Sequence, residues 1–383
     1  MARISLLLRT GGSWLAPAAL CLLTACGGDK KYYYAAFDRF DLVTDRENET
    51  FRTDANLVNP MGIQVSPSAN FWVANNGTGT LTVYAPDGTP VPEEEPRVVQ
   101  LPVPASLGAD ARSRPTALGY YGGSELQIQL DGQKESARYL VATEEGTILG
   151  YNAELDLEHA AIAVDNSSTG AVYRGLTLAA FDTSVRLYVT NFSAGRVEVF
   201  DGDFAPATDL DPAAFEDQEL PPGYGPFGIQ RVERGIYVTY AAQDSTGKNP
   251  VAGAGNGFVN LFGLDGHFAM RVASGGPLNA PYGITSSPWS FPYFERALLI
   301  GNHGDGRINA FSLWDGDFYG TLHTDDTVPL AIDGLWDIAF GPGFDGYYTL
   351  SFSAGPSDGQ NGAFGSLLTK LVETDPATLD IEP

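Results

Sequence analysis

Short apolar segments alternate with polar turns along most of this chain, and they recur as a unit of three. An apolar segment opening with Pro-x-Gly-Ile or a variant is followed by a second that ends near Asn. After a glycine, a third segment ends in an aromatic residue. The unit recurs at intervals of about 55 residues. The equivalent positions in its first segment are Gly62, Ala117, Gly175, Gly228, Gly283 and Asp337. A repeat of this length built from short strands indicates sheets arranged around an axis, so we expect an all-β, six-bladed β-propeller.

The last repeat lacks material for a fourth strand, because residues 375–383 form a polar tail that contains two prolines. The apolar segment 37–44 (FDRFDLVT) precedes the first repeat and belongs to none of them. We expect this N-terminal segment to close the last blade, which would remove an exposed sheet edge. The propeller would then span residues 37–374.

The N-terminus has the composition of an export signal. Arg3 and Arg9 precede a short apolar run at 14–25, which is followed by Cys26. Leu-Thr-Ala-Cys followed by Gly-Gly resembles a bacterial lipobox. That resemblance implies a lipoprotein signal peptide at 1–25, a diacylated Cys26 and a tether at 26–36. Gly27 in the second mature position implies the outer membrane of a Gram-negative bacterium. The alternative is an ordinary signal peptide in which Cys26 is incidental.

Cysteine content and charge exclude several classes of function. Cys21 would leave with the signal and Cys26 would carry lipid, so the mature domain would have no disulfide and no thiol nucleophile. The formal net charge is −25, which disfavours nucleic-acid binding. Such a charge is compatible with binding of Ca²⁺ or of cationic partners. The alternative is that it serves only to keep the protein soluble outside the cell.

Two resemblances accompany the repeat. Pro281-Tyr282-Gly283-Ile284 and the segment 306–311 (GRINAF) resemble NHL-type repeats. Nearly all of the mature chain resembles an uncharacterised family of exported bacterial β-propeller-like proteins. The matching segments are 56–63 (NLVNPMGI), 237–258 (YVTYAAQDSTGKNPVAGAGNGF), 279–284 (NAPYGI), 299–311 (LIGNHGDGRINAF) and 332–340 (IDGLWDIAF). Several members end in a Pro-Glu-Pro sorting tail, which this chain lacks, and the family implies no activity. More distant six-bladed relatives include lactonases with a central Ca²⁺, a likeness of fold alone.

Polar residues collect where first strands begin and second strands end, and antiparallel order brings these ends to one face of the disk. We expect this mouth of the central channel to bind a ligand through residues of several blades. They are Asn59, Asn75, Arg114, Glu144, Arg174, Asn191, Asn302, His303 and Asp333. Asn76, Glu145, Gln243, Asp244, Asn279 and Asp305 lie at equivalent strand ends. The alternative is a water-filled funnel whose side chains pair with one another.

Two kinds of chemistry fit such a mouth. Glu144, Asn191, Asn302 and Asp333 would suit a hard cation such as Ca²⁺, which could polarise a lactone or ester carbonyl. His303 with Asp305 or Asp333 could act as a general base, or it could be a solvated loop histidine.

Aromatic residues also lie near these strand ends. They are Tyr224, Phe227, Tyr240, Tyr282 and Trp336. Aromatic faces beside polar groups are typical of sugar-binding sites. The alternative is that these side chains pack in the hydrophobic core.

The sequence therefore predicts an exported, lipid-anchored propeller that acts as a binding or interaction module. Its partners would be the membrane, through the lipid, and a small molecule, glycan or protein at the mouth. The alternative is a divalent-metal-assisted hydrolase or isomerase of the lactonase kind.

Overall fold

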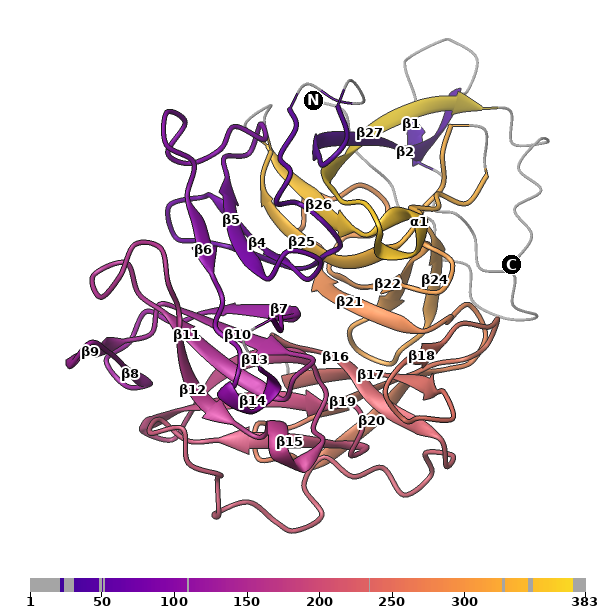
Figure 1. The fold of residues 1–383 in the computed structure, drawn as a ribbon. Helices are drawn as coiled ribbons and strands as arrows, with labels where there is room; N and C mark the ends of the chain where they lie inside the picture. The colour runs from indigo at the N-terminus through magenta and orange to yellow at the C-terminus, as the bar shows by residue number, and fades with distance from the viewer. Residues whose placement is uncertain are drawn as a thin grey trace.

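The computed structural model describes residues 21–23, 31–47, 50, 52–108, 110–233, 235–325, 328–343 and 347–374. Six antiparallel sheets surround a common centre, which confirms the six-bladed β-propeller (Figure 1). The predicted lipidation site Cys26 and the tail 375–383 lie outside the described residues. Within those residues, no helix is both long and apolar enough to cross a membrane.

The first three blades follow the order of the repeats. Blade 1 contains β3 (Pro60–Val65), β4 (Phe71–Asn75), β5 (Thr80–Tyr84) and β6 (Val98–Gln100). Blade 2 contains β7 (Pro115–Tyr120), β10 (Tyr139–Thr143), β11 (Thr147–Tyr151) and β12 (Ala161–Asp165), with an inserted hairpin of β8 (Gln127–Leu130) and β9 (Gln133–Ser136). Blade 3 contains β13 (Tyr173–Phe181), β14 (Ser184–Asn191) and β15 (Arg196–Phe200). Two 3₁₀ turns cover Ala105–Leu107 and Ser167–Thr169.

The remaining blades complete the ring. Blade 4 contains β16 (Tyr224–Val232), β17 (Gly235–Gln243), β19 (Phe258–Phe262) and β20 (Phe268–Ser274), with β18 (Pro250–Val251) beside β17. Blade 5 contains β21 (Pro281–Ser286), β22 (Ala297–Asn302), β23 (Ile308–Ser312) and β24 (Phe318–Thr321). Blade 6 contains β25 (Leu335–Pro342), β26 (Tyr348–Ala354), β27 (Ala363–Thr374) and β2 (Lys31–Thr44), and β1 (Cys21–Leu23) pairs with β2. The short helix α1 (Pro356–Gly359) joins β26 to β27.

The first strand of each blade lies innermost, and each contacts the first strands of both neighbouring blades. At the Pro-x-Gly-Ile position of every blade, the register with the second strand shifts, as in a β-bulge. Backbones approach closely there: a Cβ on Gly228 would collide with the Tyr282 carbonyl oxygen of the next blade. The repeated motif therefore provides the β-bulge in each first strand, and its glycine allows the first strands to pack closely around the axis.

Seven hydrophobic clusters among the described residues hold the ring together. Six of them each fill the gap between two neighbouring blades. The seventh closes the centre, where Phe227, Tyr282 and Trp336 meet edge to face with Met61 beside them. The Tyr282 hydroxyl lies 2.8 Å from the carbonyl oxygen of Thr116 and 2.9 Å from that of Arg174, so it links three blades. This aromatic plug separates the mouth from the channel below it.

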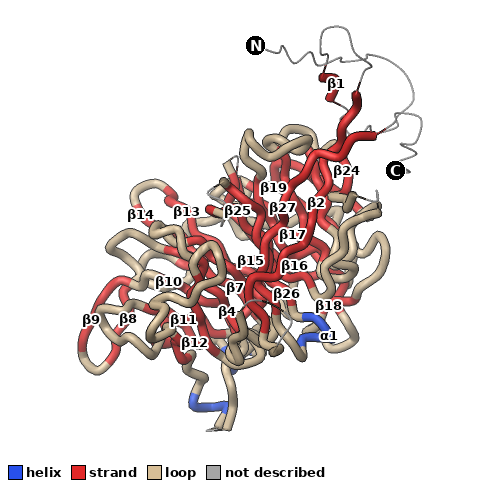
Figure 2. Tube along the Cα trace, turned by 90° about the horizontal axis from the view of Figure 1, so that it is seen from above, coloured by secondary structure: helices blue, strands red, loops and turns tan. Residues whose placement is uncertain are grey.

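Strand β2 closes the last blade, as predicted. It runs antiparallel to β27 over its length, and the two lie side by side (Figures 1 and 2). Phe37, Leu42 and Val43 are buried by this pairing. The predicted boundary was wrong, because residues 31–36, assigned to a tether, extend the strand. Tyr34 and Ala36 are buried in this extension, and their alternation along the chain could have predicted that the strand begins earlier.

Candidate functional site

A chain of side-chain contacts begins at the mouth with His303, in the loop after β22. Its ring stacks on Trp336 of blade 6 at 3.7 Å between centroids. The Trp336 indole N–H donates to Asn59 Oδ1 at 2.8 Å, and Asn59 Nδ2 donates to Asn76 Oδ1 at 3.3 Å. These contacts connect blades 5, 6 and 1.

The chain continues through an ion-pair cluster in blades 2 to 4. Asn76 Nδ2 lies 3.5 Å from Glu144 Oε1, which also accepts a 2.6 Å hydrogen bond from Arg174. Arg174 also donates to the carbonyl oxygen of Lys248 at 2.8 Å. Arg114 lies 3.1 Å from Glu144 and 2.7 Å from Glu145. One connected series of contacts, from the His303 ring to the Lys248 carbonyl oxygen, therefore reaches all six blades; it is open between blades 4 and 5, and we call it the mouth ring because it follows the rim of the mouth.

Within the mouth ring, His303 is held as a neutral base. Burial lowers the pKa of His303 to about 4. Its Nδ1 lies 3.0 Å from the Leu335 carbonyl oxygen, so Nδ1 carries the proton and Nε2 keeps a free lone pair. Neither predicted carboxylate partner contacts the ring: Asp305 accepts from Asn302 and Asp333 accepts from the Ser357 N–H. A His–Asp pair of the predicted kind is therefore not formed.

The four residues predicted to share a cation each have separate partners. Glu144 is held by two guanidinium groups, and Asn191 donates to Glu198 at 2.9 Å. Asn302 donates to the Pro277 carbonyl oxygen at 2.8 Å. No cluster of three or more His, Cys, Asp or Glu side chains able to hold a metal occurs in the part of the chain that is described. The structure thus brings Glu144 to the two arginines rather than to the other three residues.

Other predicted residues divide between the mouth and the blades. Asn75 is fully buried and donates to Thr80 and Thr82 of its own blade. Asn279 accepts from the Gly253 N–H at 2.7 Å. Among the aromatic candidates, Phe227, Tyr282 and Trp336 form the plug, whereas Tyr224 and Tyr240 pack between blades 3 and 4.

Three buried polar atoms at strand ends have no hydrogen-bond partner among the described residues. They are Arg174 Nε, Asn302 Oδ1 and Asn75 Oδ1. All three belong to residues predicted at the mouth, and Asn75 lies within its own blade. Buried polar atoms are nearly always satisfied by protein, water or ligand, but these three are enclosed by the protein itself, so they do not by themselves mark a ligand site.

One carboxyl group lies in the channel below the plug, and sequence reasoning did not assign it a role. Asp337 accepts the Ile63 N–H at 3.1 Å and the Ile338 N–H at 2.9 Å. It lines a cavity of about 40 Å³ together with the first strands of the other blades, room for a few water molecules at most. Burial raises the pKa of Asp337 to about 7. The repeat could have identified this residue from the sequence, because Asp337 occupies the position at which the other five units have Gly or Ala.

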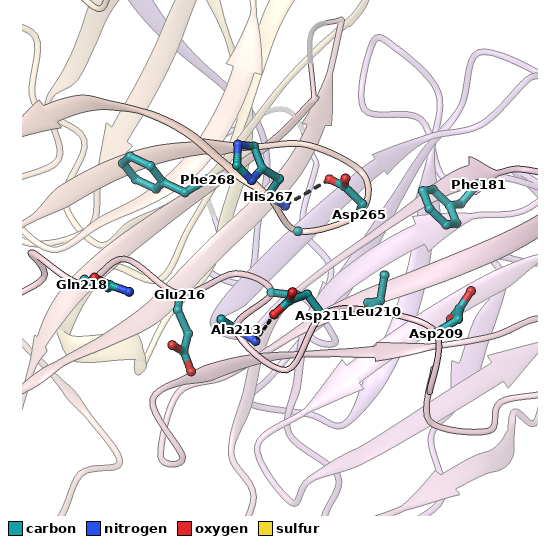
Figure 3. A pocket seen from close by; sticks show the side chains of 12 residues that line it. Phe181, Asp209, Leu210, Asp211, Ala213, Glu216, Gln218, Asp265, His267 and Phe268 are labelled. Carbon is teal, nitrogen blue, oxygen red and sulfur yellow. Dashed lines mark hydrogen bonds between the residues drawn. The ribbon is translucent and has the colours of Figure 1, made fainter.

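Two cavities that the sequence did not predict lie outside the ring of first strands, on either side of the loop after β15. Figure 3 shows the smaller one, the outer pocket, of about 490 Å³. Asp211 and Asp265 line it, but their carboxylates accept N–H bonds within their own turns, from Ala213 and His267. The larger cavity, the outer groove, measures about 690 Å³ and lies between β15 and segment 207–222.

Solved structures with a similar fold include sugar-oxidising enzymes. A glucose dehydrogenase superposes with a TM-score of 0.52 at 11% identity, covering 86% of this chain and 99% of that one. The soluble aldose sugar dehydrogenase of Escherichia coli gives a TM-score of 0.50 at 12% identity, covering 87% and 99%. At these identities the likeness shows the β-propeller fold alone.

Relatives in sequence are viral and uncharacterised. No family model matches the chain, and the resemblances to NHL repeats and to exported bacterial proteins stay predictions. The uncharacterised protein L690 of Acanthamoeba polyphaga mimivirus is 29% identical over 339 residues, covering 86% of this chain and 85% of that protein. The uncharacterised protein R648 of the same virus is 30% identical over 334 residues, covering 85% and 78%. This chain therefore belongs to the same family as R648.

Proposed function

We propose that this protein is a binding module and that its ligand contacts the mouth ring. The observation that carries the proposal is the continuity of that ring across all six blades, above a plug of aromatic side chains. A network that links every blade holds its side chains in fixed positions, which lowers the entropy cost of binding.

The chemistry of the ligand follows from the groups that the mouth leaves available. His303 Nε2 is an acceptor. Arg114 adds a guanidinium group whose side chain is 54% exposed. A small polar molecule that offers both hydroxyl donors and oxygen acceptors would match this set.

We expect replacement of His303 by phenylalanine to weaken such a ligand at least about tenfold, the loss expected for one buried hydrogen bond. The phenyl ring keeps the stacking surface on Trp336 and removes both nitrogens. The measurement is a thermal-shift screen of sugars, carboxylates and phosphates, followed by calorimetric titration of each hit. His159→Phe is the matched control, because His159 contacts Asp156 at the outer edge, away from the mouth.

The outcome that contradicts the proposal is a hit that binds wild-type protein, His303→Phe and Arg114→Ala equally well. Because the pKa of His303 is about 4, its Nε2 stays an acceptor at neutral pH, and affinity should be constant from about pH 6 to pH 8.

The metal-assisted hydrolase ranks second, because Glu144 is already neutralised by Arg114 and Arg174. A melting temperature that responds neither to Ca²⁺ nor to EDTA would remove it.

We also propose export and lipid anchoring through Cys26, on the lipobox resemblance alone. When the full chain is expressed in a Gram-negative host, we expect Cys26→Ser to move it from the detergent phase to the aqueous phase of a detergent partition, because a buried acyl chain contributes about 0.8 kcal/mol per methylene. Cys21→Ser is the control and should leave the partition unchanged. Equal partition of wild type and Cys26→Ser would contradict the proposal.

A further inference from the structure

Blade 3 is open at its outer edge, where the other five blades have a fourth strand. Its sheet ends at β15, and the loop after β15 turns back along it only briefly. Pro206 forms an isolated bridge with Phe200, and Ala207 N–H donates to the Val199 carbonyl oxygen at 2.9 Å. The chain then leaves the sheet toward blade 4.

The backbone of Val197 is free on this edge. The Val199 carbonyl oxygen faces outward, because it accepts from Ala207, and peptide groups two residues apart in a strand face the same way. The N–H and C=O of Val197 therefore face outward too, and neither has a hydrogen bond to any residue within the described ranges. Unpaired groups of this kind are a template for another strand.

The outer groove lies directly against this edge. Val197, Val199, Leu220 and Tyr224 all line its volume of about 690 Å³. All four are partly buried side chains that pack on the core between blades 3 and 4. A cavity of this size falls within the range that binds small ligands and short peptide segments.

The groove has an acidic rim. Asp211 and Glu216 line it and are exposed, and neither has an ion pair in the described chain. Arg196, the basic residue of the lining, is bound to Glu198 at 2.7 Å. A basic occupant therefore complements the rim.

The far wall of the groove is fixed in place. Phe215 N–H donates to the Gly266 carbonyl oxygen at 2.8 Å, and its ring packs against Tyr188 and Phe262. Asp217 pairs with Arg271 and accepts from Asn260. Segment 207–222 is thus anchored to blade 4, leaving the space beside β15 empty of this chain's own strand.

We propose that the outer groove binds an extended basic peptide, which adds to β15 as the missing fourth strand of blade 3. Its backbone pairs with Val197, an apolar side chain lies between Val199 and Leu220, and a lysine or arginine contacts Asp211 or Glu216. This is strand addition, in which main-chain bonds give affinity and alternate side chains give specificity. The site is independent of the mouth ring.

The test uses fluorescein-labelled nine-residue peptides of alternating lysine and valine, with fluorescence anisotropy as the readout. We expect them to bind, whereas the matching glutamate–valine peptide binds at least about tenfold more weakly because of the acidic rim. N-methylation of alternate valines should abolish binding, because it removes the N–H groups that pair with β15 while the protein stays unchanged. Equal binding of the methylated peptide, or absence of binding by the lysine–valine peptide, would overturn the proposal.

Substitutions in the protein test the same strand addition from the side of β15. Val197→Pro removes the outward N–H at an edge position that tolerates proline, and we expect at least about a tenfold loss of peptide affinity. Val197→Thr keeps the backbone donor and is the control; equal affinity of Val197→Pro and Val197→Thr would overturn strand addition. A concentration-dependent dimer in sedimentation that Val197→Pro abolishes would show that a second copy of this chain occupies the edge, and would overturn the proposal as well.

Discussion

Replacing Asp337 by asparagine should remove most of the decline in stability that we expect on raising the pH from about 4 to 7. In the folded protein, burial raises the pKa of Asp337 from 3.8 to about 7. Between these values the folded state holds one proton more than the unfolded chain. The free energy of unfolding therefore falls as pH rises through this window, and it levels off above about pH 7.

The size of the effect follows from the shift. One pKa unit corresponds to about 1.4 kcal/mol, and partial contact with the small channel cavity reduces the full value, so we expect about 2–4 kcal/mol. The measurement is urea unfolding at closely spaced pH values. Asp337→Asn should lose about 1 kcal/mol at low pH, because asparagine has a single acceptor for the Ile63 and Ile338 N–H groups.

The control for this experiment is Asp203→Asn in an exposed turn. It should keep the pH profile of the wild type. If Asp337→Asn also keeps that profile, Asp337 is ionised in the folded protein at low pH, and our account of the channel is wrong.

Replacing Arg174 by methionine should destabilise the protein by about 3 kcal/mol, the cost of leaving a partner charge without its ion pair inside a protein. The Arg174 side chain is 4% exposed and that of Glu144 17% exposed, and they lie 2.6 Å apart. The substitution leaves Glu144 with Arg114 as its remaining cation and also frees the Lys248 carbonyl oxygen.

A double-mutant cycle separates the charge from the packing. Because Glu144→Gln removes the stranded charge, the double variant Arg174→Met/Glu144→Gln should recover part of the loss. Arg196→Met is the matched control: Arg196 also pairs with a glutamate, but its side chain is 67% exposed. An exposed pair contributes less than about 1 kcal/mol. Equal losses for Arg174→Met and Arg196→Met would contradict a buried ion pair at the mouth.

The repeat was sufficient to predict the inner three strands of the blades, because most of these are buried on both faces and give near-continuous apolar segments; the partly buried β15 is an exception. Several outer strands were not predicted. β24 (Phe318–Thr321), for example, is short, half exposed and outside the repeated motif. For the same reason the sequence did not distinguish blade 3, which lacks a fourth strand, from the blades that have one. Closure by residues 37–44 was predictable because that segment was apolar and unassigned.

Strand order was also enough to bring Asn59, Glu144, Arg174 and His303 into one connected series of contacts. The pairing within the ring was not predictable, because it depends on the direction of each side chain. Glu144 faces Arg174 rather than a metal, and His303 faces Trp336 rather than Asp305. Tyr240 lies at the end of a second strand as expected, yet its ring faces blade 3.

Closure by β2 also sets how this protein would respond to mechanical load. Lys31 is the first residue of β2 and Thr374 the last of β27, and the antiparallel register pairs Thr374 with Tyr32, so these strand ends lie together. Tension applied through the two ends would therefore unzip the β2–β27 ladder one residue pair at a time, rather than load all pairs in parallel as shear would. Pulling from these ends would release the last blade first and open the ring at low force.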